Sequence, residues 1–214
     1  MKFDILNKFT GKVIFTADID ECAEDELPSI QLGLAVKCAV ENHANLSYAN
    51  LSSADLSSAD LRSANLNHAD LYSADLRSAD LNHANLSYAN LSSANLNHAD
   101  LYSANLNHAD LSYADLSAAN LSYVDLSSAD LSSADLSAAN LNHADLRSAD
   151  LVVILLPIWT VYVQSEYTRI GCKYFKNSEW LSFTDKEIAG MDNRALEWCT
   201  EYKPLIEAAI KSLN

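Results

Sequence analysis

Serine, histidine and aspartate recur close together through the middle of the chain, and these are the residue types of a hydrolytic triad. The segment Asn-His-Ala-Asp stands at 67–70, 97–100, 107–110 and 142–145. A hydrolase needs one base oriented toward one nucleophile, beside an oxyanion hole. Because the same residues repeat along the chain, no single site is selected. We therefore expect no catalytic residues and no enzymatic activity.

Histidine and cysteine are also candidate metal ligands, and zinc requires ligands that converge on one ion at about 2 Å. The six histidines are spread along the chain and form no fixed cluster, and the four cysteines form no Cys-x-x-Cys pair. We expect no metal and no cofactor. The cysteines are expected to be reduced thiols of a cytoplasmic protein. They are Cys22, Cys38, Cys172 and Cys199.

The chain of 214 residues has a formal net charge of −15. Direct binding to nucleic acid needs clustered lysine and arginine, so we do not expect it. The first residues lack the pattern of a signal peptide. The most apolar run, 151–163, is well short of the stretch of about 20 residues that a membrane-spanning helix needs, so we expect no membrane segment.

A five-residue repeat occupies about half of the chain. Leucine stands at every fifth position from Leu46 to Leu151, 22 times without a gap. The residue before each leucine is Asn or Asp, and the residue before that is Ala in every unit except one, which has Val124. The unit is therefore Ala-(Asp/Asn)-Leu-x-x.

A period of five suits neither a straight helix nor a straight strand. Five residues advance an α-helix by roughly 500°, so the leucines would scatter around it, and in a strand they would alternate between faces. All leucines face one side only if the chain turns once in each unit. Because Gly and Pro are absent between Gly33 and Pro157, we expect Asn, Asp and Ser to make these turns.

The tandem Ala-(Asp/Asn)-Leu-x-x units resemble the pentapeptide-repeat family. The resemblance implies an all-β fold, a right-handed four-sided β-helix in which four pentapeptides make one coil and Leu and the preceding Ala face inward. The 22 units would make five or six such coils. We place the solenoid at 44–153, an N-terminal cap at 1–43 and a C-terminal cap at 154–214. The core is expected to include Leu46, Leu66, Leu86, Leu106, Leu126, Leu146, Ala49, Ala89 and Ala129.

Positions four units apart should stack in columns along such coils. One column carries aromatic rings, and stacking within the column is the favoured interpretation. The alternative is a candidate surface for a protein partner, since tyrosine is favoured at interfaces. It consists of Tyr48, His68, Tyr88 and His108. A second candidate surface is acidic. It comprises Asp55, Asp60, Asp75, Asp80, Asp100, Asp115, Asp130 and Asp135.

The flanks are expected to cover the ends of the solenoid, because open ends expose core and unpaired backbone. At the N-terminal end we expect a hairpin of strands 3–7 and 13–18, followed by a helix over 28–42. At the C-terminal end we expect strands 159–163 and 169–175, a capping box at 184–187, and helices 192–202 and 204–213. Trp180 and Trp198 are expected in the C-terminal core.

The segments LGLAVK at 32–37 and RIGC at 169–172 are similar to the flanks of capped phage and bacterial members of the family. This resemblance implies an aromatic residue where Cys38 and Cys199 stand, so the chain departs from the pattern there. Engineering of these cysteines, or of the very regular array, is left open.

These observations favour a non-enzymatic interaction or structural scaffold whose protein partner the sequence does not identify; a phage-encoded origin is left open. The alternative is an acidic mimic of DNA that inhibits a bacterial DNA-binding enzyme such as gyrase, as some family members do. Thirteen repeat aspartates stand against three arginines, a charge density within about twofold of duplex DNA. An enzyme is the least favoured class. Monomer and dimer are both open.

Overall fold

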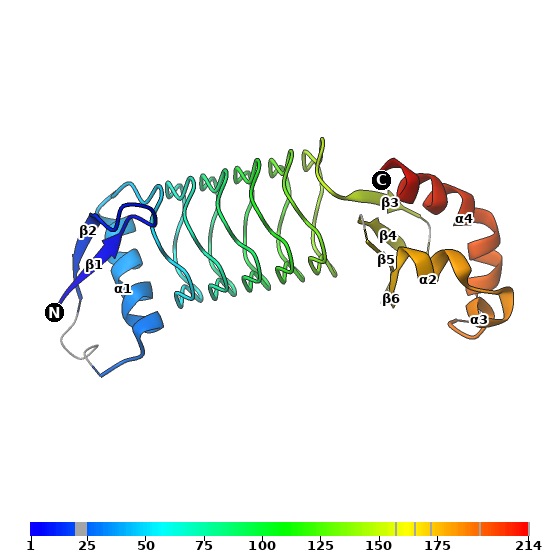
Figure 1. Cartoon of the computed structure of the whole chain (residues 1–214), viewed down its shortest axis with the longest axis horizontal. Coiled ribbons are helices and arrows are strands. Elements are labelled where there is room, and N and C mark those ends of the chain that lie inside the picture. The colour runs from blue at the N-terminus through cyan, green and yellow to red at the C-terminus, as the bar shows by residue number, and fades with distance from the viewer. Residues whose placement is uncertain (20–24, 157, 165, 172, 193, 214) are drawn as a thin grey trace. The chain divides into compact units, whose positions relative to one another are not determined.

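The computed structural model describes residues 1–19, 25–156, 158–164, 166–171, 173–192 and 194–213. The chain divides into two compact units, Met1–Ala149 and Asp150–Asn214. The first unit holds the N-terminal flank and nearly all of the repeats, and the second holds the end of the repeats and the C-terminal flank (Figure 1). Among the described helices, none combines the length and the apolar character that crossing a bilayer requires.

The repeats form stacked coils, and four repeat units make each coil. Isolated parallel bridges join equivalent positions of successive coils, from Asn50↔Asp70 to Asp125↔Asp145. Each coil donates backbone N–H groups to its neighbours on both sides, as in Leu86 N to Asn105 O, 2.7 Å, and Asp110 N to Ala89 O, 3.0 Å. This parallel ladder pairs the backbone at every level of the stack.

Every repeat turns through a left-handed residue that is not glycine. The second residue after each leucine from Leu46 to Leu146 has a φ between 53° and 61°. His43, five residues before Tyr48, shares this conformation, so the series runs without a gap from His43 to Ser148. The N–H of the following Ala closes the turn on the leucine carbonyl, as in Ala89 N to Leu86 O, 3.0 Å. The residue before leucine supports the turn: Asn85 Oδ1 accepts the N–H of Ser87 at 3.1 Å. The predicted use of Asn, Asp and Ser is confirmed.

The interior of the coils consists of leucine and alanine. Leu46, Leu66, Leu86, Leu106 and Leu126 are 0% exposed, and Ala49, Ala89 and Ala129 are at most 2% exposed. Each leucine side chain buried in this way stabilises the fold by about 1.5–3 kcal/mol. Leu146 differs, because it is only half-buried. It lies in the last coil of the unit, so no further repeat stacks on it.

The N-terminal flank lies beside the first coil (Figure 1) and accepts hydrogen bonds from backbone N–H groups of that coil. Strands β1 (Lys2–Leu6) and β2 (Val13–Asp18) form an antiparallel hairpin, and helix α1 spans Pro28–Glu41. Asn50 N donates to Leu6 O at 2.8 Å, and Asp55 N donates to Ser29 O at 3.0 Å. In later coils the equivalent N–H groups bond to the preceding coil, so the flank replaces a missing coil.

Helix α1 approaches the first coil closely at Gly33. A Cβ atom at this position would lie 1.8 Å from the backbone oxygen of Asp55. Only glycine permits this separation, which explains the glycine in the middle of a helix, where it costs about 1 kcal/mol relative to alanine.

The C-terminal unit contains a four-stranded antiparallel sheet in the order β3-β4-β5-β6. Its strands are β3 (Val152–Leu155), β4 (Thr160–Val163), β5 (Tyr167–Ile170) and β6 (Lys173–Lys176). The sequence predicted a two-stranded hairpin with one strand over 169–175. The predicted pairing is confirmed for β4 and β5, but the single strand over 169–175 was wrong, because Gly171 adopts a φ of +55° and turns the chain between β5 and β6.

Three helices follow the sheet: α2 (Asn177–Ser182), α3 (Asp185–Ala189) and α4 (Ala195–Ser212). The capping box predicted at 184–187 is confirmed, since Thr184 accepts from the N–H of Glu187 and the Glu187 carboxylate accepts from the N–H of Thr184. The sequence did not predict α2.

Two helices were predicted over 192–213, but α4 continues through Pro204. Pro204 has no N–H to donate, and an interior proline costs about 3 kcal/mol. Trp198 before it and Ile206 and Ile210 after it are at most 4% exposed and belong to one hydrophobic cluster. Burial of this continuous face outweighs the lost hydrogen bond.

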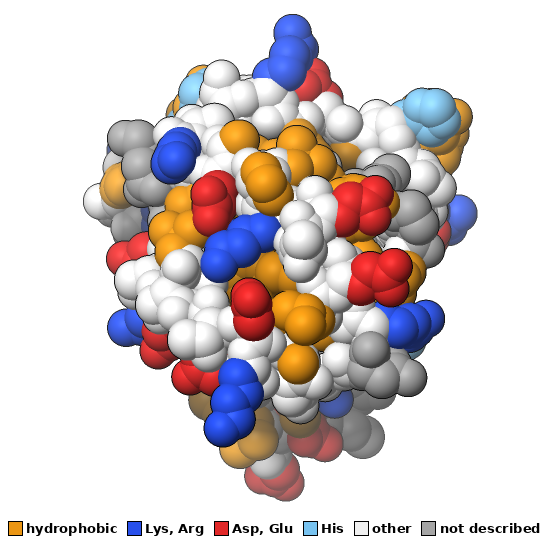
Figure 2. All heavy atoms as spheres, turned by 90° about the vertical axis from the view of Figure 1, so that its right-hand side faces the viewer, with side chains coloured by type: hydrophobic (Ala, Val, Ile, Leu, Met, Phe, Trp, Pro, Cys, Tyr) orange, Lys and Arg blue, Asp and Glu red, His pale blue; other side chains and the backbone are white. Residues whose placement is uncertain are grey.

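Trp180 and Trp198 lie in the core of the C-terminal unit, as predicted, with exposures of 3% and 4%. The end of this unit seen in Figure 2 mixes hydrophobic side chains with acidic and basic ones. Cys38 is a half-buried free thiol and Cys199 a buried one. Cys22 and Cys172 lie outside the described residues.

Candidate interaction surface

Four aromatic side chains stack along the coils in what we call the aromatic column: Tyr48, His68, Tyr88 and His108. Consecutive ring centroids are 4.6, 4.8 and 4.7 Å apart, and the rings deviate from parallel by 5° to 14°. These distances match the spacing of neighbouring β-strands, so the coil period itself sets the stack.

The backbone holds the rings of the aromatic column in place. Tyr48 N donates to Asn67 O, and Tyr88 N donates to Asn107 O, each at 2.9 Å. Tyr48 and Tyr88 nevertheless remain 37% and 48% exposed. The column therefore combines internal stacking with an accessible edge. Stacking within the column is confirmed, and the interpretation as a partner surface stays a prediction.

The N-terminal hairpin adds a residue to this column that the sequence did not predict. The ring of Phe9 lies 6.2 Å from that of Tyr48, tilted by 55°, and the Lys8 ammonium lies 5.0 Å from the Phe9 ring. Phe9 is 74% exposed. The backbone bond from Lys8 N to Tyr48 O, 2.9 Å, brings the two segments together.

A second aromatic row lies along the column of positions that contains His83, Tyr123 and His143, and the structure adds Tyr102 to it. Tyr123 and His143 stack at 4.7 Å, while His83 and Tyr102 meet edge to face at 5.7 Å. Tyr102 joins the row, 5.6 Å from Tyr123. Tyr102 immediately follows a leucine, one position earlier in its unit than the other members, so a search at the strict coil period does not find it.

The carboxylates of the acidic surface are held by the turns. Asp55 Oδ1 accepts the N–H of Ser57 at 3.1 Å and its hydroxyl at 2.6 Å, and Asp130 Oδ1 accepts the N–H of Ser132 at 2.9 Å. Asparagine makes the same bond in other units. Among the predicted acidic residues, three are exposed and the others are half-buried. The exposed ones are Asp60, Asp130 and Asp135; the half-buried ones are Asp55, Asp75, Asp80, Asp100 and Asp115.

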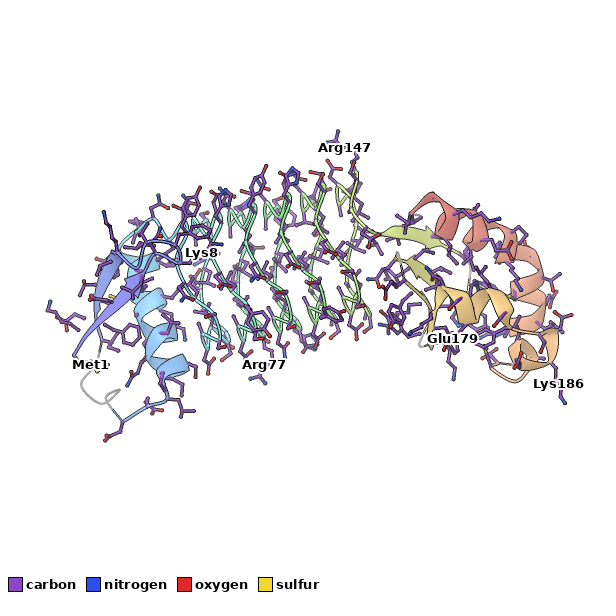
Figure 3. All side chains as sticks on the ribbon, viewed as in Figure 1. Met1, Lys8, Arg77, Arg147, Glu179 and Lys186 are labelled. Atoms are coloured by element: carbon purple, nitrogen blue, oxygen red, sulfur yellow. The ribbon has the colours of Figure 1, made fainter. Side chains whose placement is uncertain are left out.

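Three repeat arginines neutralise part of this acidic charge. Arg62 donates to Asp60, and these hydrogen bonds lower the pKa of the Asp60 carboxyl to about 2. Arg77 in the same way lowers the pKa of Asp75. Arg147 lowers the pKa of Asp145. Figure 3 shows Arg77 and Arg147 projecting outward from the coils.

Amide groups bridge some of the stacked acidic positions. Asn120 Nδ2 donates to Asp100 Oδ1 at 2.8 Å, and Asn90 Nδ2 donates to Asp70 Oδ1 at 3.1 Å. The acidic surface is thus a mixed network rather than a row of free charges. Among the described residues, no group of three or more His, Cys, Asp and Glu side chains is arranged to hold a metal ion.

A family model described as pentapeptide repeats (8 copies) matches residues 42–77, 74–112 and 114–151, just over half of the chain. The chain therefore belongs to the pentapeptide-repeat family. Among curated protein sequences, none matches it.

Several solved structures are similar over the repeats. Alr5209, a pentapeptide repeat protein from Nostoc Pcc 7120, is 42% identical over 39% of this chain, with a TM-score of 0.29. The match spans 61% of alr5209 itself.

HetL, from the cyanobacterium Nostoc sp. Strain PCC 7120, is a pentapeptide repeat protein involved in heterocyst differentiation regulation. It is 31% identical over 49% of this chain and 73% of its own, with a TM-score of 0.22. Full-length QnrB1, a plasmid-mediated fluoroquinolone resistance protein, is 28% identical over 47% of this chain and 52% of its own, with a TM-score of 0.26. The family assignment rests on the repeats and not on these likenesses.

Proposed function

We propose that this protein is a non-enzymatic scaffold whose coils bind a protein partner through the aromatic column. The observation that carries the proposal is the exposure of Tyr48 and Tyr88 within a stack that the backbone holds rigid. A pre-ordered tyrosine loses little conformational entropy on binding, and tyrosine is enriched at interface anchors.

The proposed scaffold is a right-handed, four-sided β-helix that acts in the cytoplasm. Four turns in each coil, each with one left-handed residue, support the four sides. The free thiols of Cys38 and Cys199 support a reducing compartment.

A capture experiment from bacterial lysate tests the role of the aromatic column. The baits are the wild-type protein, the double variant Tyr48→Ser/Tyr88→Ser, and the control Tyr72→Ser. Tyr72 is 49% exposed but lies outside the column. We expect a partner that binds the wild type and the control, resists salt, and is lost with the double variant. Equal binding by all three baits would contradict the proposal.

The second candidate function is an acidic DNA mimic that inhibits a bacterial DNA-binding enzyme such as gyrase. The stacked carboxylates of Asp60, Asp80 and Asp100 and of Asp115 and Asp135 favour it, since parallel bridges join these positions. Asparagine fills the same turn position in other units, so Asp→Asn variants change charge with little effect on the turns.

The Asp→Asn substitutions separate the two candidates. If the protein is a DNA mimic, its partner should leave the bait at moderate salt, be displaced by duplex DNA, and be lost when Asp115, Asp130 and Asp135 are replaced by Asn. A partner of the aromatic column should tolerate all three of these conditions.

A further inference from the structure

A cavity of about 90 Å³ lies within the C-terminal unit, between the sheet and helices α2 to α4. Its walls are largely apolar, and four aromatic residues contribute to them: Trp159, Phe175, Trp180 and Trp198. The rings of Trp159 and Trp198 meet edge to face at 5.1 Å. The cavity is open on one side, so a bound molecule larger than the enclosed volume would extend toward solvent.

Two buried hydrogen-bond donors on this wall have no acceptor in the described part of the chain. They are the indole Nε1 atoms of Trp180 and Trp198, whose side chains are 3% and 4% exposed. A buried tryptophan normally finds a partner for its N–H, because an unpaired buried donor is unfavourable. Both tryptophans line the cavity, and an acceptor that reached their N–H groups from it would remove this cost.

The charged residues on the rim favour an acceptor that is negatively charged. Asp192 already accepts from the N–H of Arg194 at 2.9 Å and lies 3.6 Å from its Nε atom. Lys173 is exposed and, among the described residues, has no carboxylate within ion-pair distance. The unpaired charge at the mouth is therefore positive.

Cys199 also lines the cavity, and burial raises the pKa of its thiol. The thiol is therefore neutral at ordinary pH and adds a weak S–H donor rather than a competing negative charge. The residues that line the cavity thus carry three neutral donors and one ammonium beside mostly apolar side chains.

We propose that this cavity binds a small apolar carboxylate, with the carboxylate placed between Lys173 and the indole N–H groups and the apolar body against the aromatic walls. A single-ring or short branched acid matches the volume, because a cavity of about 150 Å³ holds a benzene molecule and this one is open on one side. The proposal is independent of the aromatic column of the coils.

Indole N–H resonances in a ¹H–¹⁵N spectrum of the full chain test the proposal directly. All three tryptophans lie in this unit, so the protein gives three such signals. The probes are benzoate and isobutyrate, with benzamide as the uncharged counterpart of benzoate. We expect at least one acid to bind saturably, with a Kd of about 1 mM or tighter, and to shift the signals of Trp180 and Trp198. Benzamide should bind more weakly.

Two lysine variants identify the source of the charge preference. Lys173→Met should weaken binding of the acid about tenfold and leave the affinity for benzamide unchanged. The matched control Lys186→Met lies on α3, outside the cavity lining, and should bind like the wild type (Figure 3). Unchanged spectra of the free variants establish that both are folded.

Three results would overturn the proposal. If neither acid shifts an indole signal, the cavity does not bind this class of molecule. If benzamide and benzoate bind with equal affinity, the negative charge of the carboxylate does not contribute to recognition. If Lys173→Met and Lys186→Met behave alike, the carboxylate does not lie at Lys173.

Discussion

The coils and the C-terminal unit treat their buried polar groups differently. In the coils, neighbouring coils and local turns pair the backbone, and amides such as Asn120 bridge stacked side chains. Asn82 Oδ1 is the buried side-chain atom of the described coils that lacks a donor. The C-terminal unit instead leaves two indole N–H groups unpaired around a cavity. The periodic coils thus supply hydrogen-bond partners for nearly all of their buried polar groups. The C-terminal unit, which has no repeat, retains buried donors that a ligand would satisfy.

Overpacking the coils should give the largest effect and test whether the two units are separable. Ala89 is 1% exposed, so Ala89→Leu forces a larger side chain into a filled interior and should destabilise the coils by about 1–3 kcal/mol or more. Thermal unfolding followed by circular dichroism measures this change. Tryptophan fluorescence, which reports only on the C-terminal unit, should be unaffected.

The matched control for Ala89→Leu is Tyr72→Leu, at an outward position that is 49% exposed. It should change the unfolding temperature little. If Ala89→Leu unfolds at the same temperature as the wild type, the alanine of each unit does not face the interior of the coils. An equal shift of the fluorescence transition would contradict the separation of the two units.

Adding a negative charge to the hydrogen-bonded turns should have a smaller effect on the stability of the coils. Asn120→Asp keeps the oxygen that accepts the N–H of Ser122, but it replaces the donor to Asp100 with a second carboxylate. We expect a loss of about 0.5–1.5 kcal/mol in unfolding free energy at low salt, which decreases as salt is added.

Asn65→Asp is the control for that substitution, because position 65 is bridged to Asn85 rather than to an aspartate. Chemical denaturation of both variants at two salt concentrations provides the measurement. Equal losses in the two variants, or a loss that salt does not reduce, would show that repulsion from Asp100 is not the cause.

The smallest expected effect is the pH-dependent contribution of the Asp60–Arg62 ion pair to the stability of the coils. The folded-state pKa of Asp60 is lowered from 3.8 to about 2, so the pair stabilises the coils above pH 3.8 and this contribution is lost as the pH falls through about 2. Arg62→Met should raise the pKa of Asp60 toward 3.8, measured by NMR titration of its carboxyl group. An unchanged pKa would exclude the arginine as the cause.

The sequence predicted the coils well because one physical constraint recurs in every unit. Leucine at every fifth position must face inward, and this requirement determines the turns and the coil stacking that brings Tyr48 next to His68. The left-handed residue in each turn was not predicted, because serine, histidine, tyrosine and alanine all occupy the position and none requires a positive φ.

The C-terminal unit was predicted less well because no period constrains it. Its helix α4 continues through Pro204 since tertiary burial outweighs a local preference, and the turn at Gly171 divides what resembled one strand. The cavity draws its lining from several strands and helices, and Phe9 reaches the aromatic column from another segment. Such contacts depend on tertiary packing that sequence spacing does not encode.

The stacking of four units per coil also constrains how the gene of such a protein can change in length. Gain or loss of one complete coil returns every later residue to its original column, so Tyr88 would still lie in line with Tyr48. Gain or loss of a single pentapeptide preserves every leucine in the core yet moves all later side chains into the neighbouring column. Recombination that adds or removes a single repeat can therefore preserve the fold while it changes which side chains share a column on the surface. Gain or loss of a whole coil preserves both the fold and the columns.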